Sequence, residues 1–456
     1  MMPGESPLKP RPFTVMAKPA GSLCNLECSY CYYSNPTTHE RPDEQGAGQA
    51  AETGSGRSRM SDRLLELFIR QYIGSSPGPT VSFTWHGGEP TLAGLDFYKL
   101  AVKLQKQYLP EGWNCWNNLQ TNGILLNDEW CAFLAEEHFD IGFSIDGTQW
   151  LHDKYRMDHK GNGSYERAVL AIRCLQSHGV QPDLLCTVTS DAAKRPLDIY
   201  RALRSFNTGW IQFIPIVRRT GPQKIEPSRH ENGRLTPHDQ PDTVTPDSVS
   251  GKMYGKFLCA VFDEWVLHDL GRLDVQLFAE TMRIRSGGKA GLCWMADVCG
   301  KALIVEHNGS VYSCDHFVFP EHRIGNIETS NLGILADSPA QRRFGEDKRS
   351  TLPAQCRSCP QLALCNGGCP KDRFALSEDG EPGLNYLCEG LRSFFTYSEP
   401  AMNLVRSLSK QGQTSEAIMA NLNSRLAALW KGVSRNDPCP CGSGKKAKHC
   451  CWTGLH

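Results

Sequence analysis

Hydrophobic segments of two kinds alternate along the first half of the chain. Short segments rich in β-branched and aromatic residues have the pattern of strands, and they lie at 12–18, 80–86, 114–120, 140–145, 183–189 and 210–217. Longer segments with apolar residues at helical spacing lie between them, at 62–73, 95–108, 128–138, 164–179 and 196–206. Ser61 precedes the first of these as a favourable N-cap. Repeated strand-then-helix units predict an α/β fold with a parallel sheet, either open or curled into a partial barrel.

Polar and proline-rich segments interrupt this pattern and indicate the domain organisation. Residues 36–60 and 219–247 are expected to be flexible insertions, the second containing five prolines. A long helix is predicted at 250–271, and residues 408–436 have the composition of a polar, partly helical linker. The expected divisions are a tail at 1–12, a core at 13–245, a linker helix with a cysteine-rich domain at 248–400, a linker at 401–434 and a small module at 435–456.

Composition and charge exclude several classes of protein. The 456 residues are enough for two to four domains of roughly 100–200 residues each. Lys+Arg and Asp+Glu both total 49, so no net charge points to nucleic acid or to a membrane surface. The first residues contain no apolar segment before a small-residue cleavage site, and no run of 18 apolar residues is present. We therefore expect a cytoplasmic protein.

Twenty cysteines are the unusual feature of the composition. Thiols of a long chain without a secretion signal are expected to be reduced, and clustered reduced thiols indicate bound metal. The clusters lie at 24–31, 293–388 and 439–451. The remaining cysteines stand singly in apolar stretches and are predicted to be small core residues: Cys115, Cys131, Cys174, Cys186 and Cys259.

Polar motifs follow the predicted strands, where the chemistry of a parallel α/β barrel collects. The first strand is followed by Cys24-x3-Cys28-x2-Cys31, and later strands by GGEP at 87–90, QTNG at 120–123 and SIDG at 144–147. Three thiolates can hold three irons of a [4Fe–4S] cluster and leave the fourth iron open to a small molecule. A zinc site that borrows a distant fourth ligand is the alternative.

The second cysteine group contains eight residues, which is enough for two sites of four ligands. Two [4Fe–4S] clusters and two zinc sites fit this number equally well. The cysteines are Cys293, Cys299, Cys314, Cys356, Cys359, Cys365, Cys369 and Cys388.

The Cys24–Cys31 motif, Tyr30 and GGEP together resemble the radical S-adenosylmethionine (SAM) superfamily. The resemblance implies that the open iron binds the methionine moiety, and that one-electron reduction of the sulfonium yields a 5′-deoxyadenosyl radical. It also implies a TIM-like partial (β/α)6 barrel. The positions that match the SAM contacts of the superfamily are Tyr30, Gly88 for the methionine amino group, Ser144 and Arg156 for ribose and carboxylate, and Val217 near adenine. An ordinary surface ion pair for Arg156 and a plain strand residue for Val217 are the alternatives.

The spacing of the second cysteine group resembles the SPASM domain of peptide- and protein-modifying radical enzymes. This resemblance implies two interleaved [4Fe–4S] sites, which would bring the total to three clusters. The first auxiliary set would be Cys293, Cys299, Cys314 and Cys369, and the second Cys356, Cys359, Cys365 and Cys388.

Segments beyond the cysteines resemble anaerobic sulfatase-maturating enzymes across about residues 13–400. The matching segments are WHGGEPTLAGLDFY, QTNG, SIDG, IQFIPIV, VYSCDHFV and CNGGCPKDRF. The resemblance implies oxidation of Cys or Ser in a Cys/Ser-x-Pro-x-Arg motif to Cα-formylglycine. It further implies an unfolded or nascent sulfatase as substrate, and a low-potential electron donor of flavodoxin or ferredoxin type.

Asp315 directly follows the proposed ligand Cys314, so the chain holds it beside the first auxiliary site. Oxidation to the aldehyde level removes two electrons and two protons, and the SAM-derived radical removes one hydrogen atom. An auxiliary cluster can accept the remaining electron, and a nearby carboxylate can accept the proton. In the family the matching Asp is the proposed base; the alternative is that Asp315 only hydrogen-bonds backbone around the cluster.

The last residues, from 435 onwards, resemble the SEC-C zinc motif. The implied tetrahedral ligands are Cys439, Cys441, Cys450 and Cys451, with His449 as a substitute for one of them. A segment this short cannot bury a core, so a metal ion should supply its folding energy. Its lysines are compatible with docking to protein or nucleic acid and equally with a solvated face.

Two further functions remain open at this point. One is a peptide maturase that forms thioether or carbon–carbon cross-links with the same three clusters. The other is a zinc-binding adaptor with no catalytic activity, which the cysteine content alone also permits.

Overall fold

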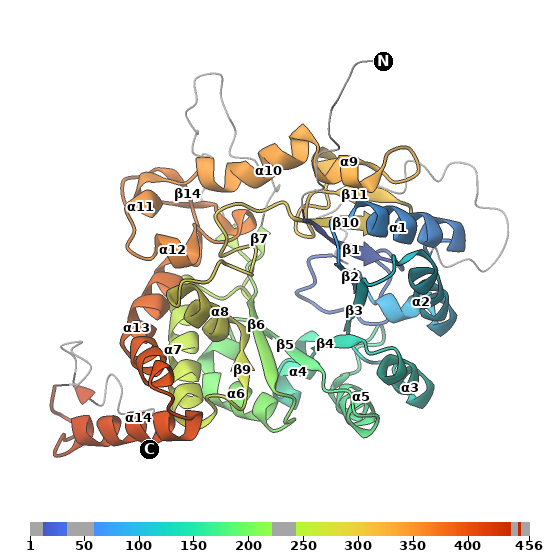
Figure 1. The fold of residues 1–456 in the computed structure, drawn as a ribbon. Coiled ribbons are helices and arrows are strands. Elements are labelled where there is room, and N and C mark those ends of the chain that lie inside the picture. Colours follow the sequence, from blue (N-terminus) through green and yellow to red (C-terminus); the bar gives the residue numbers. More distant parts are fainter. Residues whose placement is uncertain (1–11, 34–58, 221–242, 439–445, 448–456) are drawn as a thin grey trace.

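The structure is a computed structural model that describes residues 12–33, 59–220, 243–438 and 446–447 (Figure 1). Six parallel strands lie side by side in chain order: β1 (Thr14–Lys18), β2 (Thr80–Trp85), β3 (Asn114–Thr121), β4 (Asp140–Ser144), β5 (Asp183–Val188) and β6 (Trp210–Pro215). All six coincide with predicted strands, so the predicted α/β architecture is confirmed.

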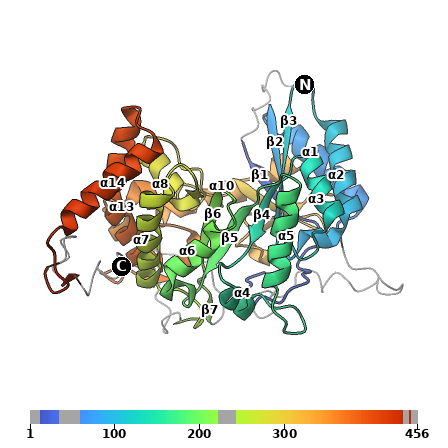
Figure 2. The same cartoon turned by 90° about the horizontal axis from the view of Figure 1, so that it is seen from below.

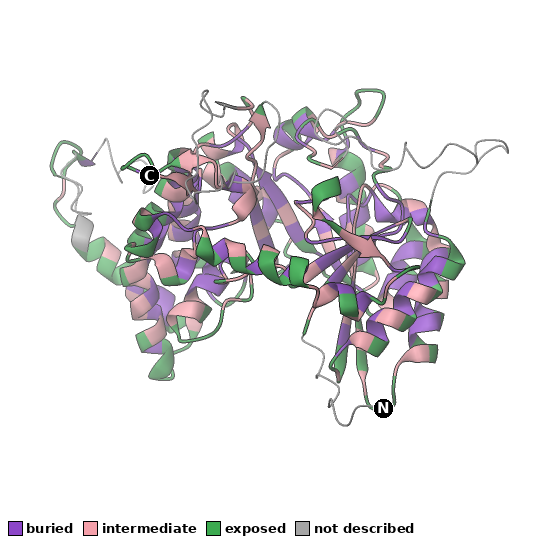
Figure 3. Ribbon diagram, turned by 90° about the horizontal axis from the view of Figure 1, so that it is seen from above, coloured by how far each residue is buried: buried purple, intermediate pink, exposed green. Residues whose placement is uncertain are grey.

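Helices separate these strands as the periodicity predicts. They are α1 (Asp62–Ser75), α2 (Leu95–Tyr108), α3 (Asp128–Glu136), α4 (Gln149–Tyr155), α5 (Tyr165–Ser177) and α6 (Pro196–Arg204). The Ser61 hydroxyl accepts a hydrogen bond from the Leu64 amide at 3.2 Å, which confirms it as the N-cap of α1. In Figure 2, α1, α2, α3 and α5 lie along one side of the curved sheet. Buried residues concentrate on the strands and the inner faces of the helices (Figure 3).

The cysteine-rich half extends the same sheet, which the sequence pattern did not predict. Strand β10 (Ala302–Glu306) pairs in parallel with β1, and β11 (Ser310–Tyr312) and β12 (Arg323–Asn326) continue the sheet antiparallel. At the other edge β9 (Asp274–Val275) pairs with β6, giving a ten-stranded sheet. The open edge of β1 would expose unpaired backbone groups, and β10 satisfies them.

Further helices and short strands form the rest of the cysteine-rich half. They are α7 (Gly251–His268), α8 (Gln276–Arg285), α9 (Leu332–Ala336), α10 (Pro339–Ser350), α11 (Ala354–Arg357), α12 (Leu362–Cys365), β13 (Ala375–Leu376) and β14 (Pro382–Leu384). Two more helices follow: α13 (Cys388–Lys410) runs down the left side of Figure 1, and α14 (Ser415–Trp430) lies across its lower left. A Cβ added at Gly390 of α13 would lie 1.9 Å from the Gly251 carbonyl oxygen, so α13 and α7 pack backbone to backbone.

Residues 401–434, expected to be a polar linker, are largely helical and packed. Ile418, Met419 and Leu422 of α14 are buried, and Asn423 donates a hydrogen bond to the Leu267 carbonyl at the end of α7 at 3.0 Å. The apolar side chains lie at i, i+1 and i+4 and thus on one helix face, which explains the docking.

Several sequence predictions concern residues outside the described part of the chain, namely the tail at 1–11, most of the 36–60 insertion and all four proposed zinc cysteines. At the ends of the predicted 219–247 insertion, β7 (Arg219–Thr220) pairs antiparallel with β8 (Thr243–Val244). Of the five single cysteines, Cys131 and Cys186 are buried, and the other three are half-buried against the core. Within the described residues, no helix is both long and apolar enough to cross a membrane.

Candidate active site

The loop after β1 carries the first three cysteines at the carboxyl end of the sheet. Its backbone is held by the amides of Glu27 and Ser29, which donate to the carbonyls of Met157 and Tyr155 at 2.7 and 3.0 Å. Burial raises the pKa of Cys24 to about 12 and that of Cys28 to about 11. Metal ligation requires the thiolate form, so a bound cation would have to favour deprotonation of these buried thiols.

The GGEP and QTNG motifs converge on this loop. A Cβ added at Gly88 would lie 2.2 Å from the Leu23 carbonyl oxygen, so only glycine permits this approach to the cysteine loop. The buried Glu89 carboxylate accepts hydrogen bonds from the Thr121 hydroxyl and the Asn122 amide, both at 2.8 Å. Asn122 in turn donates to Asn25 Oδ1 at 2.8 Å, so Glu89 ties two strand ends to the loop.

Asp146 of the SIDG motif organises two of the predicted SAM contacts. Arg156 donates to its carboxylate from Nε at 2.9 Å and from Nη2 at 3.3 Å, and the Tyr30 hydroxyl donates to the same carboxylate. The amide and hydroxyl of Thr187 complete the network at 2.9 and 2.8 Å. Although burial acts in the opposite direction, Arg156 keeps the pKa of Asp146 below its usual value. Tyr30 and Arg156 are therefore fixed beside the cysteine loop through a residue that the sequence predictions did not assign.

The other two predicted SAM contacts lie at the ends of neighbouring strands. Ser144 is the last residue of β4, and its hydroxyl accepts a hydrogen bond from Gln120 Nε2 at 3.3 Å. Val217 follows β6 and packs, half-buried, against the main core. Together with Gly88, these residues stand at the strand ends that surround the cysteine loop.

Where the structure describes them, the cysteine sulfur atoms of the predicted ligand sets do not form a preassembled single-ion site. Zinc bound by thiolates has Zn–S distances of about 2.3 Å, which places the sulfurs of a tetrahedral site about 3.8 Å apart. Among the described residues, no three sulfur atoms of the predicted ligand sets lie within 4.8 Å of one another.

Asp315 and Lys18 connect the two halves of the protein. Strand β1 ends at Lys18, whose side chain is fully buried, and its Nζ lies 2.7 Å from Asp315 Oδ1. The Tyr32 hydroxyl donates to Asp315 Oδ2. Although burial acts in the opposite direction, Lys18 keeps the pKa of Asp315 well below its usual value. The carboxylate is therefore ionised and held from both oxygens.

Lys18 has two further partners in this buried network. Glu306 of β10 lies opposite Lys18 in the β1–β10 register, and one of its oxygens is 3.8 Å from Nζ. The Tyr33 ring centroid lies 3.5 Å from Nζ, and the Tyr33 hydroxyl donates to Glu306 at 2.7 Å. The sequence predictions missed Lys18 and Glu306. A charged residue at the end of an otherwise apolar strand was the available signal for both.

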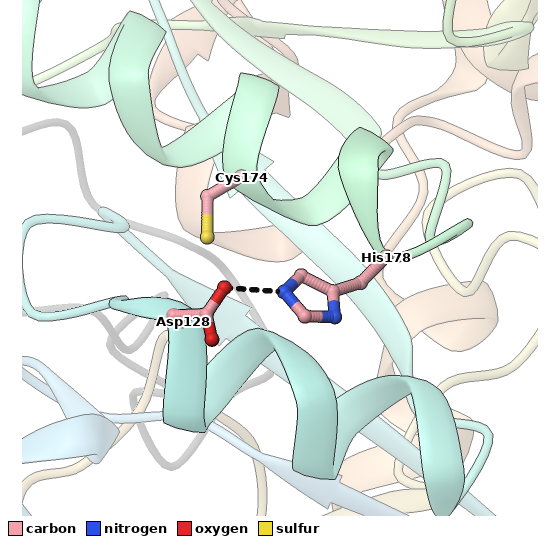
Figure 4. Close-up of side chains that lie close together, drawn as sticks. All are labelled: Asp128, Cys174 and His178. Atoms are coloured by element: carbon pink, nitrogen blue, oxygen red, sulfur yellow. Dashed lines mark hydrogen bonds and ion pairs between the residues drawn. The ribbon is translucent and has the colours of Figure 1, made fainter.

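Asp128, Cys174 and His178 form a separate cluster on α3 and α5 (Figure 4). His178 Nε2 lies 2.8 Å from Asp128 Oδ1, and the carboxylate is largely exposed. Asp128 begins α3 and His178 caps the carboxyl end of α5, where the helix dipoles favour an acid and a base respectively. The cluster contains none of the predicted ligands and stabilises the contact between the two helices.

Comparisons with known proteins agree with this geometry. The radical SAM superfamily profile matches residues 19–191, the SPASM iron–sulfur cluster-binding domain profile matches 293–360 and the SEC-C motif matches 435–453. The serine-type anaerobic sulfatase-maturating enzyme of Bacteroides thetaiotaomicron is 41% identical over 90% of this chain and 95% of its own length. The cysteine-type enzyme of Clostridium perfringens is 30% identical over 86% of this chain and 97% of its own length.

Two solved structures share the fold of this chain. Native anSMEcpe with bound AdoMet and the Kp18Cys peptide is 29% identical, covers 87% of this chain and 99% of its own, and superposes with a TM-score of 0.71. Streptococcus suis SuiB bound to its precursor peptide SuiA shares the fold at 14% identity, with a TM-score of 0.54, over 83% of this chain and 76% of its own.

The fold and the cysteine sites define a radical SAM enzyme with an iron–sulfur SPASM domain, which uses S-adenosylmethionine and [4Fe–4S] clusters. The chain belongs to the family of anaerobic sulfatase-maturating enzymes, and it carries a SEC-C motif at its C-terminus.

Proposed function

We propose that this protein oxidises a Cys or Ser side chain of a sulfatase, within Cys/Ser-x-Pro-x-Arg, to Cα-formylglycine under anaerobic conditions. The hydrogen bond from Tyr32 to Asp315 is the observation that carries this proposal. Tyr32 follows Cys31 and Asp315 follows Cys314, so one bond joins loops 283 residues apart in the chain. A substrate side chain at this junction would be close to both the SAM site and the first auxiliary site.

The proposed ligand sets are those expected from the sequence. Cys24, Cys28 and Cys31 would hold the cluster that binds SAM, with Tyr30, Gly88, Ser144, Arg156 and Val217 around the SAM molecule. The first auxiliary set would be Cys293, Cys299, Cys314 and Cys369, and the second Cys356, Cys359, Cys365 and Cys388. The four C-terminal cysteines, Cys439, Cys441, Cys450 and Cys451, would bind zinc, and the domain limits would be those given above.

A side chain of this protein would accept the proton that the substrate thiol or hydroxyl loses. Bound SAM would supply the radical that removes a hydrogen atom from the substrate Cβ, and the auxiliary clusters would accept the remaining electron. Asp315 would accept the thiol or hydroxyl proton. Serine would then give the aldehyde directly, whereas cysteine would give a thioaldehyde that water hydrolyses with release of sulfide. Lys18 and Tyr32 each occupy one carboxylate oxygen, and since a carboxylate offers about four lone-pair sites, acceptor positions remain on both oxygens.

The substrate residue, the substrate protein and the electron donor complete the proposal. Relatives described as serine-type and as cysteine-type both match, so we propose that the substrate residue is one of these two. An unfolded or nascent sulfatase would present the motif. A flavodoxin- or ferredoxin-type protein would supply the electron that initiates turnover.

Anaerobic turnover with short peptides tests the proposal. We expect the reconstituted enzyme to convert a peptide with Cys-x-Pro-x-Arg, Ser-x-Pro-x-Arg or both to a product that reacts with an aldehyde-specific hydrazide and has the mass of formylglycine. A peptide with Ala at the target position is the control. A product that has lost two hydrogens and does not react with the hydrazide would indicate a cross-link and contradict the proposal.

A further inference from the structure

Helix α10 is polar in sequence but presents one buried face to the cysteine-rich half. Gln341, Gly345 and Lys348 are its buried residues, and their spacing of four and three places them on the same face. This face lies against the segments that carry Cys293, Cys299 and Cys314. Those cysteines are three of the four proposed ligands of the first auxiliary cluster.

Each residue of this face contacts at least one of these segments. Gln341 donates to the carbonyls of Gly300 and Ser313, at 2.8 and 3.0 Å, which are the neighbours of Cys299 and Cys314. A Cβ added at Gly345 would lie 2.5 Å from the Cys299 carbonyl oxygen, so the helix backbone rests directly on the ligand.

Lys348 contacts the third segment, which carries Cys293. Its Nζ donates to the carbonyls of Cys293 at 2.8 Å and Trp294 at 2.9 Å, and also to that of Ala296. The residue is 1% exposed. Within the described part of the chain, no carboxylate pairs with it at 4.0 Å or less, whereas Lys371 nearby pairs with Asp372 at 2.7 Å. The carbonyls satisfy the N–H groups of Lys348 but leave its charge uncompensated.

Arg373, which is half-buried, is a second cation without a carboxylate partner among the described residues. Its guanidinium donates to the carbonyls of Asn366, Gly367 and Lys348, at 2.7, 2.9 and 2.6 Å, and to no carboxylate among the described residues. Its partners Asn366 and Gly367 lie in the chain between Cys365 of the second set and Cys369 of the first, whereas Lys348 contacts the carbonyl of Cys293 in the first set. Arg373 therefore lies between the two sites, and Lys348 lies at the first.

Burial of an unpaired cation is costly unless an anion compensates it. A [4Fe–4S] cluster with four thiolate ligands is a net anion, and its reduced form carries one more negative charge. We propose that Lys348 and Arg373 are the counter-ions of the auxiliary clusters, and that Lys348 raises the reduction potential of the first so that it can accept the electron from the substrate. This inference rests on the ligand sets of the proposed function.

A redox titration of the full-length protein tests the role of Lys348 without substrate or SAM. Replacing Cys24, Cys28 and Cys31 by Ala leaves only the auxiliary clusters to contribute, and EPR then follows their reduction. In this background we expect Lys348→Met to lower the reduction potential of one of the two auxiliary clusters by at least about 59 mV. This is a tenfold change in the one-electron equilibrium constant. Lys348→Arg should retain most of the potential of the parent.

Arg349→Gln is the matched control, because Arg349 is the next residue of α10 and its side chain is 73% exposed. Water screens its charge, so we expect an unchanged potential. A Lys348→Met protein with full iron content and an unchanged potential overturns the proposal. If Lys348→Met loses about four irons per chain, restoration by Lys348→Arg supports the counter-ion role, and failure of both variants overturns it. The sulfatase reaction can fail in the peptide assay without affecting these outcomes.

Discussion

Lys18 at the end of β1 and Asp315 beyond β11 form an ion pair of 2.7 Å that joins the barrel to the cysteine-rich half. The pair exists because β10 adds to the sheet in parallel beside β1, with Lys18 opposite Glu306 in the register. The chain then returns through β11, and Asp315 meets the loop that carries the first three cysteines. The site thus lies at the carboxyl ends of the sheet strands, where the two halves of the chain meet.

Substitution Asp315→Asn removes the proposed proton acceptor and nearly preserves the shape of the side chain. We expect the variant to cleave S-adenosylmethionine but to form at least a hundredfold less formylglycine, because general-base groups typically contribute 10²–10⁴-fold. Deoxyadenosine and modified peptide are quantified in the same reaction. Product formation near the wild-type rate would show that Asp315 is not the base.

Substitution Lys18→Met leaves Asp315 and Glu306 without their cation inside the protein. We expect a loss of about 3–5 kcal/mol in the free energy of unfolding, because an unpaired buried charge is strongly destabilising. Anaerobic urea unfolding measures this loss. The double variant Lys18→Met/Asp315→Asn should recover part of it, and additive losses would contradict the coupling between the two side chains.

Substitution Gly88→Ala places a methyl group 2.2 Å from the Leu23 carbonyl oxygen and must displace the cysteine loop. We expect at least a tenfold decrease in S-adenosylmethionine cleavage and a lower iron content. Gly74→Ala is the matched control, since a Cβ there meets nothing within 4 Å and alanine favours the helix. Equal cleavage by both variants would remove the argument for close approach at Gly88.

His152 gives the protein a pH dependence of stability. Burial lowers its pKa to about 4 in the folded state, against 6.5 for the unperturbed side chain. Nδ1 accepts from the Asp146 amide at 3.3 Å, and Nε2 lies 2.9 Å from the Ser164 hydroxyl, whose proton goes to the Arg156 carbonyl at 2.7 Å. One ring nitrogen accepts a hydrogen bond and the other donates one, so this arrangement requires the neutral imidazole.

Because the folded pKa is depressed, the stability contribution of His152 is present above pH 6.5 and is lost as the pH falls towards 4. Lowering the pKa from 6.5 to about 4 corresponds to roughly 3 kcal/mol at most. We expect the difference in unfolding free energy between wild type and His152→Gln to shrink over this range, measured anaerobically at pH 7.5, 6 and 5. A constant difference would contradict the assignment.

Local patterns in the sequence predicted the strands and helices of the first half and the residues proposed to carry its chemistry. Strands such as β2 and helices such as α2 follow from apolar periodicity and from caps like Ser61, which act within a few residues. The cysteine spacing predicted cluster sites for the same reason, since Cys24, Cys28 and Cys31 share one short loop. The structure adds that the linker at 401–434, expected to be polar and partly helical from 408 onwards, packs against α7, and that the ends of the 219–247 insertion pair as strands.

Only the tertiary structure decided how the two halves meet. The pairing of β1 with β10, which sets Thr14 opposite Ala302, depends on contacts between segments far apart in the chain, and no local periodicity specifies such a register. The same holds for Lys18 beside Asp315 and for Lys348 on the buried face of α10, because a lysine in a polar stretch has the same sequence pattern whether it faces water or an anionic site. The sequence by itself predicted the residues proposed to hold metal and SAM, because those motifs are local, and the long-range packing decided which charges surround them.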